Sequence, residues 1–212
     1  MGKGHDHEIR EHLRHTLAAM GSAASPDAVE RLAVYVQELT RWSRRMSLTT
    51  LDPTAIVDRL VQPSLALAAL PPYWSAAAVA DLGSGGGIPG VPLQIVAPRP
   101  RFVLIEARQR RAAFLRHIVR VCRLQGVEVV EGRAEAIVWA PEQRVDLVVC
   151  RAVAPAVTAL QWCIGLVRLG GSVAIAAGGE AATESDLPAG WEALPRGSSQ
   201  AWAALLYRRC ST

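Results

Sequence analysis

A glycine-rich stretch near the middle of the chain has the residue types and spacing of a ligand-binding turn. Residues 79–82 are a short apolar segment that contains Asp81, residues 83–90 are rich in glycine, and residues 91–96 are again apolar. A strand, a glycine turn and a helix in this order bring the backbone of an α/β sheet close to a nucleotide-like ligand. The glycines permit positive φ angles and remove side chains that would keep the ligand away.

Two acids indicate which ligand this turn binds. The dinucleotide pattern G-x-G-x-x-G occurs at residues 85–90, but it is out of register with a strand that ends near Leu82. Asp81 would oppose a pyrophosphate at the helix N-terminus. It suits a ligand without phosphate and with a positive sulfonium and ammonium end, such as S-adenosylmethionine. Glu106 ends the apolar segment 102–106, about 20 residues past the turn, where an acid accepts both ribose hydroxyls.

Two further stretches follow predicted strands and should lie at the same edge of the sheet, where ligands of α/β proteins bind. Ala134 and Glu135 either border an adenine or belong to a surface turn. Arg151 follows the next strand, and an arginine at a buried strand end is costly unless it is paired. We therefore expect Arg151 either to pair with Asp81 or Glu106, or to face the ligand and the substrate.

These residues must be positioned by a sheet, because short apolar strands alternate with helical segments along the second part of the chain. The expected strands are residues 79–82, 102–106, 127–130, 145–150 and 172–176, with a last, antiparallel strand at 201–207. The expected helices are residues 91–96, 108–124 and 155–167. This alternation predicts an α/β fold with a mostly parallel, Rossmann-like sheet and helices on both faces.

The first part of the chain predicts a helical extension. Ser25 followed by proline is the start signal of a helix with one apolar stripe. A second helical segment covers residues 54–70 and is interrupted by Pro63. We expect residues 1–72 to form a tail and a helical cap, packed on a Rossmann-like domain of residues 73–212 in one compact unit.

Composition narrows the class of protein. The chain has 212 residues, of which 50% are hydrophobic, enough for one α/β domain of roughly 150 residues with an extension. Cysteines stand far apart at Cys122, Cys150, Cys163 and Cys210, which favours reduced thiols of a cytoplasmic protein over disulfides or a zinc site. The four histidines in residues 5–15 are interpreted as part of a solvated, partly frayed terminus rather than as a metal site. No apolar run is long enough to span a membrane.

The charge is moderately basic and almost entirely arginine. The net charge is +4, and Lys3 is the only lysine. Arginine suits phosphate recognition and stacking on bases better than lysine does. On the predicted helix 108–124, Arg116, Arg120 and Arg123 share one edge. That edge is either a solvated basic face or a contact surface for RNA phosphates.

Taken together, these stretches resemble the bacterial 16S rRNA guanine-N7 methyltransferase G family, also called glucose-inhibited division protein B. The similar segments are SLT at 47–49, DLGSGGGIPGVPL at 81–93, RR at 110–111 with FLR at 114–116, GRAE at 132–135 and RAVA at 151–154. They occur in order and with the family's spacing, from about residue 30 to about residue 180. The segment that contains IPGVP is more specific than a generic methyltransferase turn.

The resemblance implies a class I methyltransferase fold, S-adenosylmethionine as cofactor, and methylation of guanine N7 in 16S rRNA. It places Gly83, Ile88, Ala134, Glu135 and Arg151 at the cofactor. With the residues argued above, the predicted cofactor-binding set is Asp81, Gly83, Gly85, Gly87, Ile88, Glu106, Ala134, Glu135 and Arg151. Arg151 is also the predicted catalytic residue, and no metal ligand is expected. Arg110, Arg111 and Arg116 are expected to engage RNA phosphates or to brace the fold.

The chain departs from the family at four polar positions on the substrate side. The replacements are Ser47 for asparagine, Leu60 for histidine, Pro63 for aspartate, and Ala177 for a lysine before glycine. The cofactor segments are kept while the substrate side loses polar groups. This pattern leaves three functions open: methylation of 16S rRNA or the 30S subunit, methylation of a small heteroaromatic metabolite, or cofactor binding without catalysis in an RNA- or protein-binding module.

Overall fold

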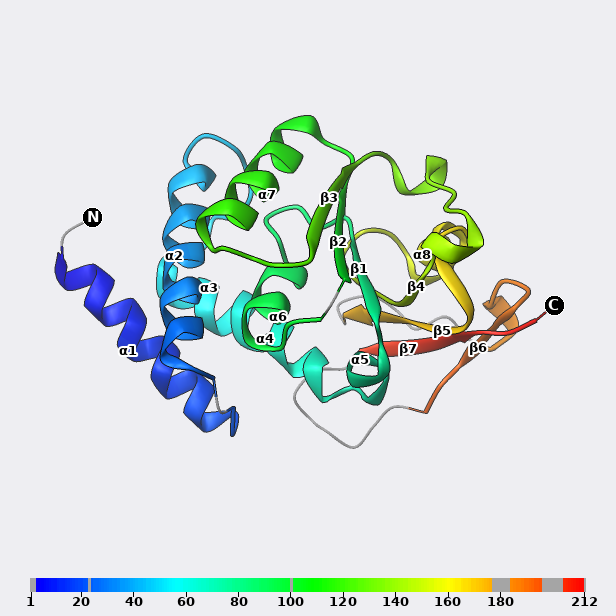
Figure 1. Cartoon of the computed structure of the whole chain (residues 1–212), viewed down its shortest axis with the longest axis horizontal. Helices are drawn as coiled ribbons and strands as arrows, with labels where there is room; N and C mark the ends of the chain where they lie inside the picture. Colours follow the sequence, from blue (N-terminus) through cyan, green and yellow to red (C-terminus); the bar gives the residue numbers. More distant parts are fainter. Residues whose placement is uncertain (1–2, 23, 100, 177–183, 196–203, 212) are drawn as a thin grey trace.

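Seven strands form one mixed sheet in the order β3-β2-β1-β4-β5-β7-β6 (Figure 1). Strands β1 to β5 pair in parallel, and β7 is antiparallel to both β5 and β6. The strands are Ala78–Leu82 (β1), Arg101–Glu106 (β2), Val127–Glu131 (β3), Val145–Arg151 (β4), Val167–Ala176 (β5), Trp191–Ala193 (β6) and Leu205–Arg209 (β7). The computed structural model describes residues 3–22, 24–99, 101–176, 184–195 and 204–211.

Helices cover both faces of the sheet, as the alternation of strands and helices predicted. Strand β2 shows the two faces clearly, because Phe102 and Leu104 belong to one buried cluster and Val103 and Ile105 to the other. The first cluster includes helices α6 (Gly90–Val96) and α7 (Gln109–Val121), and the second includes α8 (Ala156–Cys163). The predicted α/β, Rossmann-like fold of the class I methyltransferases is therefore confirmed.

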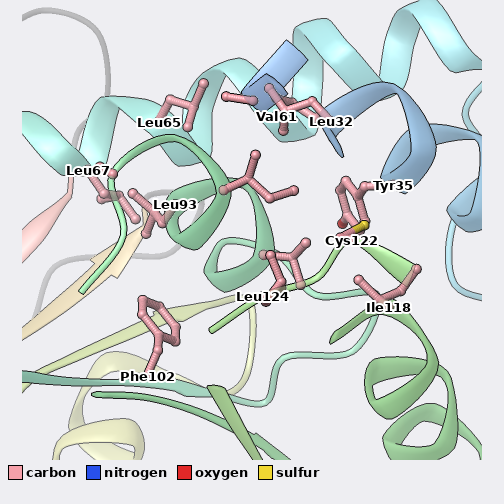
Figure 2. Packing of buried hydrophobic residues seen from close by; sticks show 14 of the residues in the cluster. Leu32, Tyr35, Val61, Leu65, Leu67, Leu93, Phe102, Ile118, Cys122 and Leu124 are labelled. Atoms are coloured by element: carbon pink, nitrogen blue, oxygen red, sulfur yellow. The ribbon is translucent and has the colours of Figure 1, made fainter. Parts of the chain in front are cut away.

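The helical extension packs on the same face as α6 and α7 (Figures 1 and 2). Its helices are α1 (Lys3–Ala19), α2 (Pro26–Ser43), α3 (Pro53–Ile56), α4 (Gln62–Ala66) and α5 (Pro71–Ser75). The predicted start signal at Ser25 is confirmed, because Ser25 Oγ accepts the Ala28 N–H at 3.1 Å, and Asp52 Oδ1 caps α3 in the same way by accepting the Ala55 N–H at 2.8 Å. These bonds satisfy backbone donors that a helix N-terminus leaves unpaired.

The expectation of a frayed N-terminus is wrong. Residues 3–19 form helix α1, and Ile9, Leu13 and Leu17 are buried in the cluster that α1 shares with α2. Four-residue spacing puts these apolar side chains on one face of the helix, and their burial outweighs the polar residues between them. His12, on the same helix, hydrogen bonds through Nε2 to Asp58 Oδ1 at 2.7 Å.

Pro63 does not break the second helical segment. A π-helical stretch, Val57–Val61 (η1), precedes α4, and the 3₁₀ turn Leu67–Ala69 (η2) follows it. Proline has no N–H to donate to the carbonyl of Arg59, four residues earlier, and the wider π turn accommodates this loss. The helical path therefore continues through residues 53–69.

The C-terminal part of the sheet differs from the expectation in its bounds. Strand β5 begins at Val167, before the glycine pair at 170–171, and β6 was not predicted. The antiparallel last strand is confirmed as β7, while residues 201–203 of the expected strand lie outside the described residues. Cys122, Cys150 and Cys163 are buried free thiols, as expected. Across the described ranges, none of the helices has both the length and the apolar composition that a membrane crossing requires.

Candidate active site

Three strands of the sheet bring their carboxyl ends together at one edge. In the register of β1, Leu82 pairs with Ile105 of β2 and with Cys150 of β4. The chain order of the strands reverses between β1 and β4, and ligands of doubly wound α/β proteins bind at this reversal. Glu106 and Arg151 are the last residues of β2 and β4, so both lie at this edge.

Two adjoining cavities open at this edge, one on each side of the glycine turn. The larger cavity, about 540 Å³, is lined in part by Glu106, Ala134 and Glu135. The smaller cavity, about 290 Å³, is lined in part by Thr49 and Arg151. Three residues line both cavities: Gly83, Arg111 and Ala152. Their combined size is in the range of cofactor and small-molecule sites.

The glycine turn requires glycine at two positions for reasons of space and of backbone angle. Gly83 has φ +72°, and a Cβ on it would lie 2.7 Å from Val153 Cγ2. Gly87 has φ +90°, and a Cβ on it would lie 2.6 Å from Val91 Cγ2. Side chains are strained at such angles and would collide here. At Gly83, the backbone of the turn therefore forms part of the wall of both cavities.

The carboxylate of Glu106 binds the backbone next to the larger cavity. Oε2 accepts the Gly85 N–H at 2.9 Å, and Oε1 accepts the Arg108 N–H at 2.8 Å. Each carboxylate oxygen has two lone-pair sites, so both oxygens keep room for a further donor. The side chain is only 5% exposed, and the part of Glu106 that remains accessible faces the larger cavity.

Asp81 lies beneath the turn and is completely buried. Its Oδ2 accepts the Gly90 N–H at 3.0 Å at the start of α6, and its Oδ1 has no hydrogen-bond partner among the residues that the structure describes. Burial raises the pKa of Asp81 from 3.8 to about 7, although the Gly90 N–H and Ser84 act in the opposite direction. Asp81 lines neither cavity, so its direct contact with a ligand stays a prediction.

The raised pKa of Asp81 predicts a pH-dependent stability. Because the pKa of Asp81 is higher in the folded than in the unfolded protein, protonation of Asp81 stabilises the fold. This stabilisation is complete below about pH 4 and is lost as the pH rises through about 7. Asp81→Asn should remove this loss. The free energy of unfolding of the variant relative to wild type should therefore rise by up to about 4 kcal/mol between pH 4 and pH 8. Urea unfolding at both pH values measures the difference, and a difference that does not change with pH contradicts the prediction.

Arg151 reaches from the end of β4 into the smaller cavity and to the helical extension. Its Nη1 donates to the carbonyl oxygen of Arg59 at 3.3 Å. This is the carbonyl that Pro63 cannot engage, because proline has no N–H. Pro63, one of the four substrate-side departures, thus leaves the Arg59 carbonyl as an acceptor for Arg151. The following residue, Ala152, has φ +50°, a strained angle for a non-glycine residue at a site edge.

The structure brings most of the predicted site residues together. Gly83, Glu106, Ala134 and Glu135 line the larger cavity, and Gly83, Gly85, Ile88 and Arg151 line the smaller one. Gly87 lies within the turn and lines neither cavity. Glu135 forms an ion pair with Arg133 at 3.0 Å.

The departures from the family pattern fall at different places. Leu60 lines the smaller cavity, and the carbonyl of Ser47 accepts a hydrogen bond from Arg111 Nη2 at 3.1 Å. Arg111 therefore braces the loop before Thr49, one of the two roles expected for it. Arg116 forms an ion pair with Glu131 at 3.1 Å. Ala177 lies outside the described residues.

Two residues near the cavities carried no sequence signal. Trp162 of α8 lines the larger cavity, and Tyr35 of α2 donates from its hydroxyl to the carbonyl of Gly86 at 2.8 Å. Tyr35 lies between the apolar positions that marked the buried stripe of α2, and its partner is far away in the sequence. Only tertiary packing connects either residue with the turn.

The fold and the paired cavities at the glycine turn define the class of protein: a class I methyltransferase, with S-adenosylmethionine as cofactor. The partly available Glu106 carboxylate and the glycine backbone of the turn at the cavities fit S-adenosylmethionine. The chain belongs to the family described as rRNA small subunit methyltransferase G, whose model matches residues 28–189.

Curated members of this family are similar over most of the chain. The ribosomal RNA small subunit methyltransferase G of Rubrobacter xylanophilus is 37% identical over 80% of this chain and 66% of its own length, just under two thirds. That of Roseiflexus sp. is 37% identical over 81% of this chain and 74% of its own length. Among solved structures, cofactor-bound Rv0187 from MTB matches with a TM-score of 0.54 and 19% identity over 85% of this chain and 89% of its own. That likeness shows the fold.

Proposed function

We propose that the protein methylates N7 of a guanine in the 16S rRNA of the small ribosomal subunit, in the cytoplasm. The observation that carries the proposal is that Arg151 lines the smaller cavity, which adjoins the larger one at the glycine turn. Membership in the methyltransferase G family supports an rRNA acceptor, since the curated relatives carry that name. The comparisons do not favour the small-molecule alternative.

The larger cavity is the proposed site of the adenosine part of the cofactor. Glu106 would accept the ribose hydroxyls, and Ala134 and Glu135 would border the adenine. Asp81 would support the site indirectly, because it accepts the Gly90 N–H and so fixes the start of α6 relative to β1. When bound, S-adenosylmethionine supplies a methyl group on an electron-poor sulfonium.

The smaller cavity is the proposed site of the guanine. Leu39, Leu48 and Leu60 give it apolar walls, and Thr49 and Arg151 add polar groups. Guanine N7 carries a free lone pair and no proton, so its methylation needs no general base. Among the described residues that line this cavity there is no Asp, Glu, His or Cys. We assign Arg151 the role of donating to guanine O6, which leaves N7 free to attack the methyl group.

Five exposed arginines without an ion-pair partner among the described residues line a cavity or lie in segments next to residues that do. We name them the mouth arginines: Arg44, Arg45, Arg59, Arg108 and Arg110. Arg44 and Arg45 end α2 beside the loop to Thr49, and Arg108 lines the larger cavity. Elsewhere on the surface, Arg10, Arg14, Arg31, Arg168 and Arg208 form ion pairs, whereas Arg120 and Arg123 are exposed and have no ion-pair partner among the described residues. Unpaired guanidinium groups at the mouth are suited to bind the phosphates of a large RNA acceptor.

Replacing two mouth arginines should weaken RNA binding without affecting the cofactor. For Arg45→Gln/Arg110→Gln we expect a roughly tenfold higher KM for the RNA acceptor and a smaller dependence of binding on salt, because two phosphate contacts are lost. Affinity for S-adenosylhomocysteine should stay within about twofold of wild type. Arg14→Gln/Arg208→Gln is the matched control on distant surfaces. An unchanged KM in the first variant would exclude these residues from the RNA contact.

The experiment that tests the proposed function offers three acceptors in parallel. Protein and tritiated S-adenosylmethionine are incubated with 30S subunits, with naked 16S rRNA and with a metabolite extract, all from cells that lack the gene. Label in either RNA sample supports the proposal, and the comparison of the two identifies the assembly state that is recognised. Label confined to the metabolite extract supports the small heteroaromatic acceptor. Cofactor binding with no labelled product in any sample supports a non-catalytic module.

A further inference from the structure

The glycine turn is held from two opposite sides. On the side of the sheet, Glu106 accepts the Gly85 N–H at 2.9 Å. On the side of the helical extension, Tyr35 Oη of α2 donates to the Gly86 carbonyl at 2.8 Å. Among the described residues, this is the only side-chain hydrogen bond that the extension makes to residues 83–90.

Tyr35 contacts the turn from a fully buried position. The Tyr35 side chain is 0% exposed and lies in the cluster next to Cys122 (Figure 2). Burial raises the pKa of Tyr35 well above its usual value, so its hydroxyl stays a donor. One helical turn further along α2, Leu39 Cδ1 would lie 3.0 Å from a Cβ on Gly86. Helix α2 therefore packs closely against the turn through Leu39 and hydrogen bonds to it through Tyr35.

We infer that Tyr35 is a positioning residue, which holds the Gly85–Gly87 backbone in the conformation that binds the methyl donor. Gly85 and Gly86 line the smaller cavity, and the Gly85 N–H is bound to Glu106, the proposed ribose acceptor in the larger cavity. A shift of these peptide groups therefore also displaces the carboxylate that meets the cofactor. Without the Tyr35 hydroxyl, the Gly86 carbonyl needs another hydrogen-bond donor, and the turn would change its conformation to reach one. The helical extension thus completes the cofactor site, although none of its residues was predicted there.

A second buried tyrosine supplies a matched control. Tyr73 is also 0% exposed, and its hydroxyl donates to the Ala97 carbonyl at 2.6 Å, just past the C-terminal end of α6 and away from the turn. Tyr35→Phe and Tyr73→Phe each remove the hydroxyl of a fully buried tyrosine that donates to a backbone carbonyl. Their effects on folding should be similar, and their effects on the cofactor site should differ.

The test is calorimetry with S-adenosylhomocysteine on wild type and both variants, together with thermal unfolding. We expect Tyr35→Phe to raise the Kd about five- to tenfold and Tyr73→Phe to leave it within about twofold, at comparable losses of Tm. A Kd within twofold of wild type for Tyr35→Phe overturns the inference, as does an equal weakening in Tyr73→Phe. If Tyr35→Phe does not fold, Gly86→Ala displaces the turn from α2 instead, because its Cβ would lie 3.0 Å from Leu39 Cδ1, and unchanged affinity there also overturns the inference. Cofactor binding alone is measured, so the result is independent of the proposed rRNA acceptor.

Discussion

Arg151→Ala is expected to lower methyl transfer by about 100-fold or more, while the Kd for S-adenosylhomocysteine stays within about threefold of wild type. The guanidinium lies in the smaller cavity and is anchored to the Arg59 carbonyl at 3.3 Å. Its proposed role is to hold guanine through O6 so that the N7 lone pair points at the methyl group. That work is done in the transition state, so its loss should appear in kcat rather than in cofactor binding.

The control for Arg151→Ala is an arginine with a similar anchor outside the site. Arg101 is also partly buried and donates from Nη1 to the carbonyl of Gln143 at 2.7 Å. Arg101→Ala should keep turnover within about threefold of wild type. Single-turnover rates and calorimetry on both variants separate chemistry from binding. Wild-type turnover in Arg151→Ala would remove the proposed role, and a parallel loss in Arg101→Ala would attribute the effect to folding.

Glu106→Ala is expected to raise the Kd for S-adenosylhomocysteine by at least about 100-fold, because the two charge-assisted bonds proposed for the ribose hydroxyls are lost. The same substitution removes the acceptor of the Gly85 and Arg108 N–H groups, so the turn also loses its attachment to the sheet. The effect should therefore exceed that of the Tyr35 hydroxyl on the opposite side of the turn. Calorimetry measures it directly.

Glu131→Ala is the matched control, because Glu131 pairs with Glu106 in the register of β2 and β3. Its carboxylate forms an ion pair with Arg116 at 3.1 Å and lines neither cavity. An exposed ion pair contributes little to stability, so cofactor affinity should hardly change. A Glu106→Ala protein that unfolds like wild type and binds S-adenosylhomocysteine as tightly would contradict the assignment of the ribose site.

The core of the site could be predicted from sequence because local rules determine it. A strand that contains Asp81, a turn with obligatory glycines, and Glu106 at the end of the next strand are all readable from spacing. The same holds for the start of α2, where Ser25 caps the helix. In each case, the residues that interact are close in sequence or lie at the ends of adjacent parallel strands.

The remaining features depend on packing between distant segments. Tyr35 and Gly86 are 51 residues apart, and no periodicity connects them. Proline in the second helical segment predicts a break, whereas the π turn before it keeps the helical path and the Arg59 carbonyl binds Arg151. Helix α1 was missed because its three buried apolar residues are outnumbered by polar ones, and only packing on segments distant in sequence, chiefly α2, buries them.

The most direct test of the proposed function is the chemical identity of the methylated nucleoside. Small-subunit RNA labelled by the purified protein and tritiated S-adenosylmethionine is digested to nucleosides and separated by chromatography with mass detection. The proposed geometry, with Arg151 on O6 and no general base in the cavity, predicts that the label elutes as 7-methylguanosine. Label in a ribose 2′-O-methyl group, in a methylated pyrimidine or on an exocyclic amine would contradict it, because those acceptors must lose a proton or present a different edge.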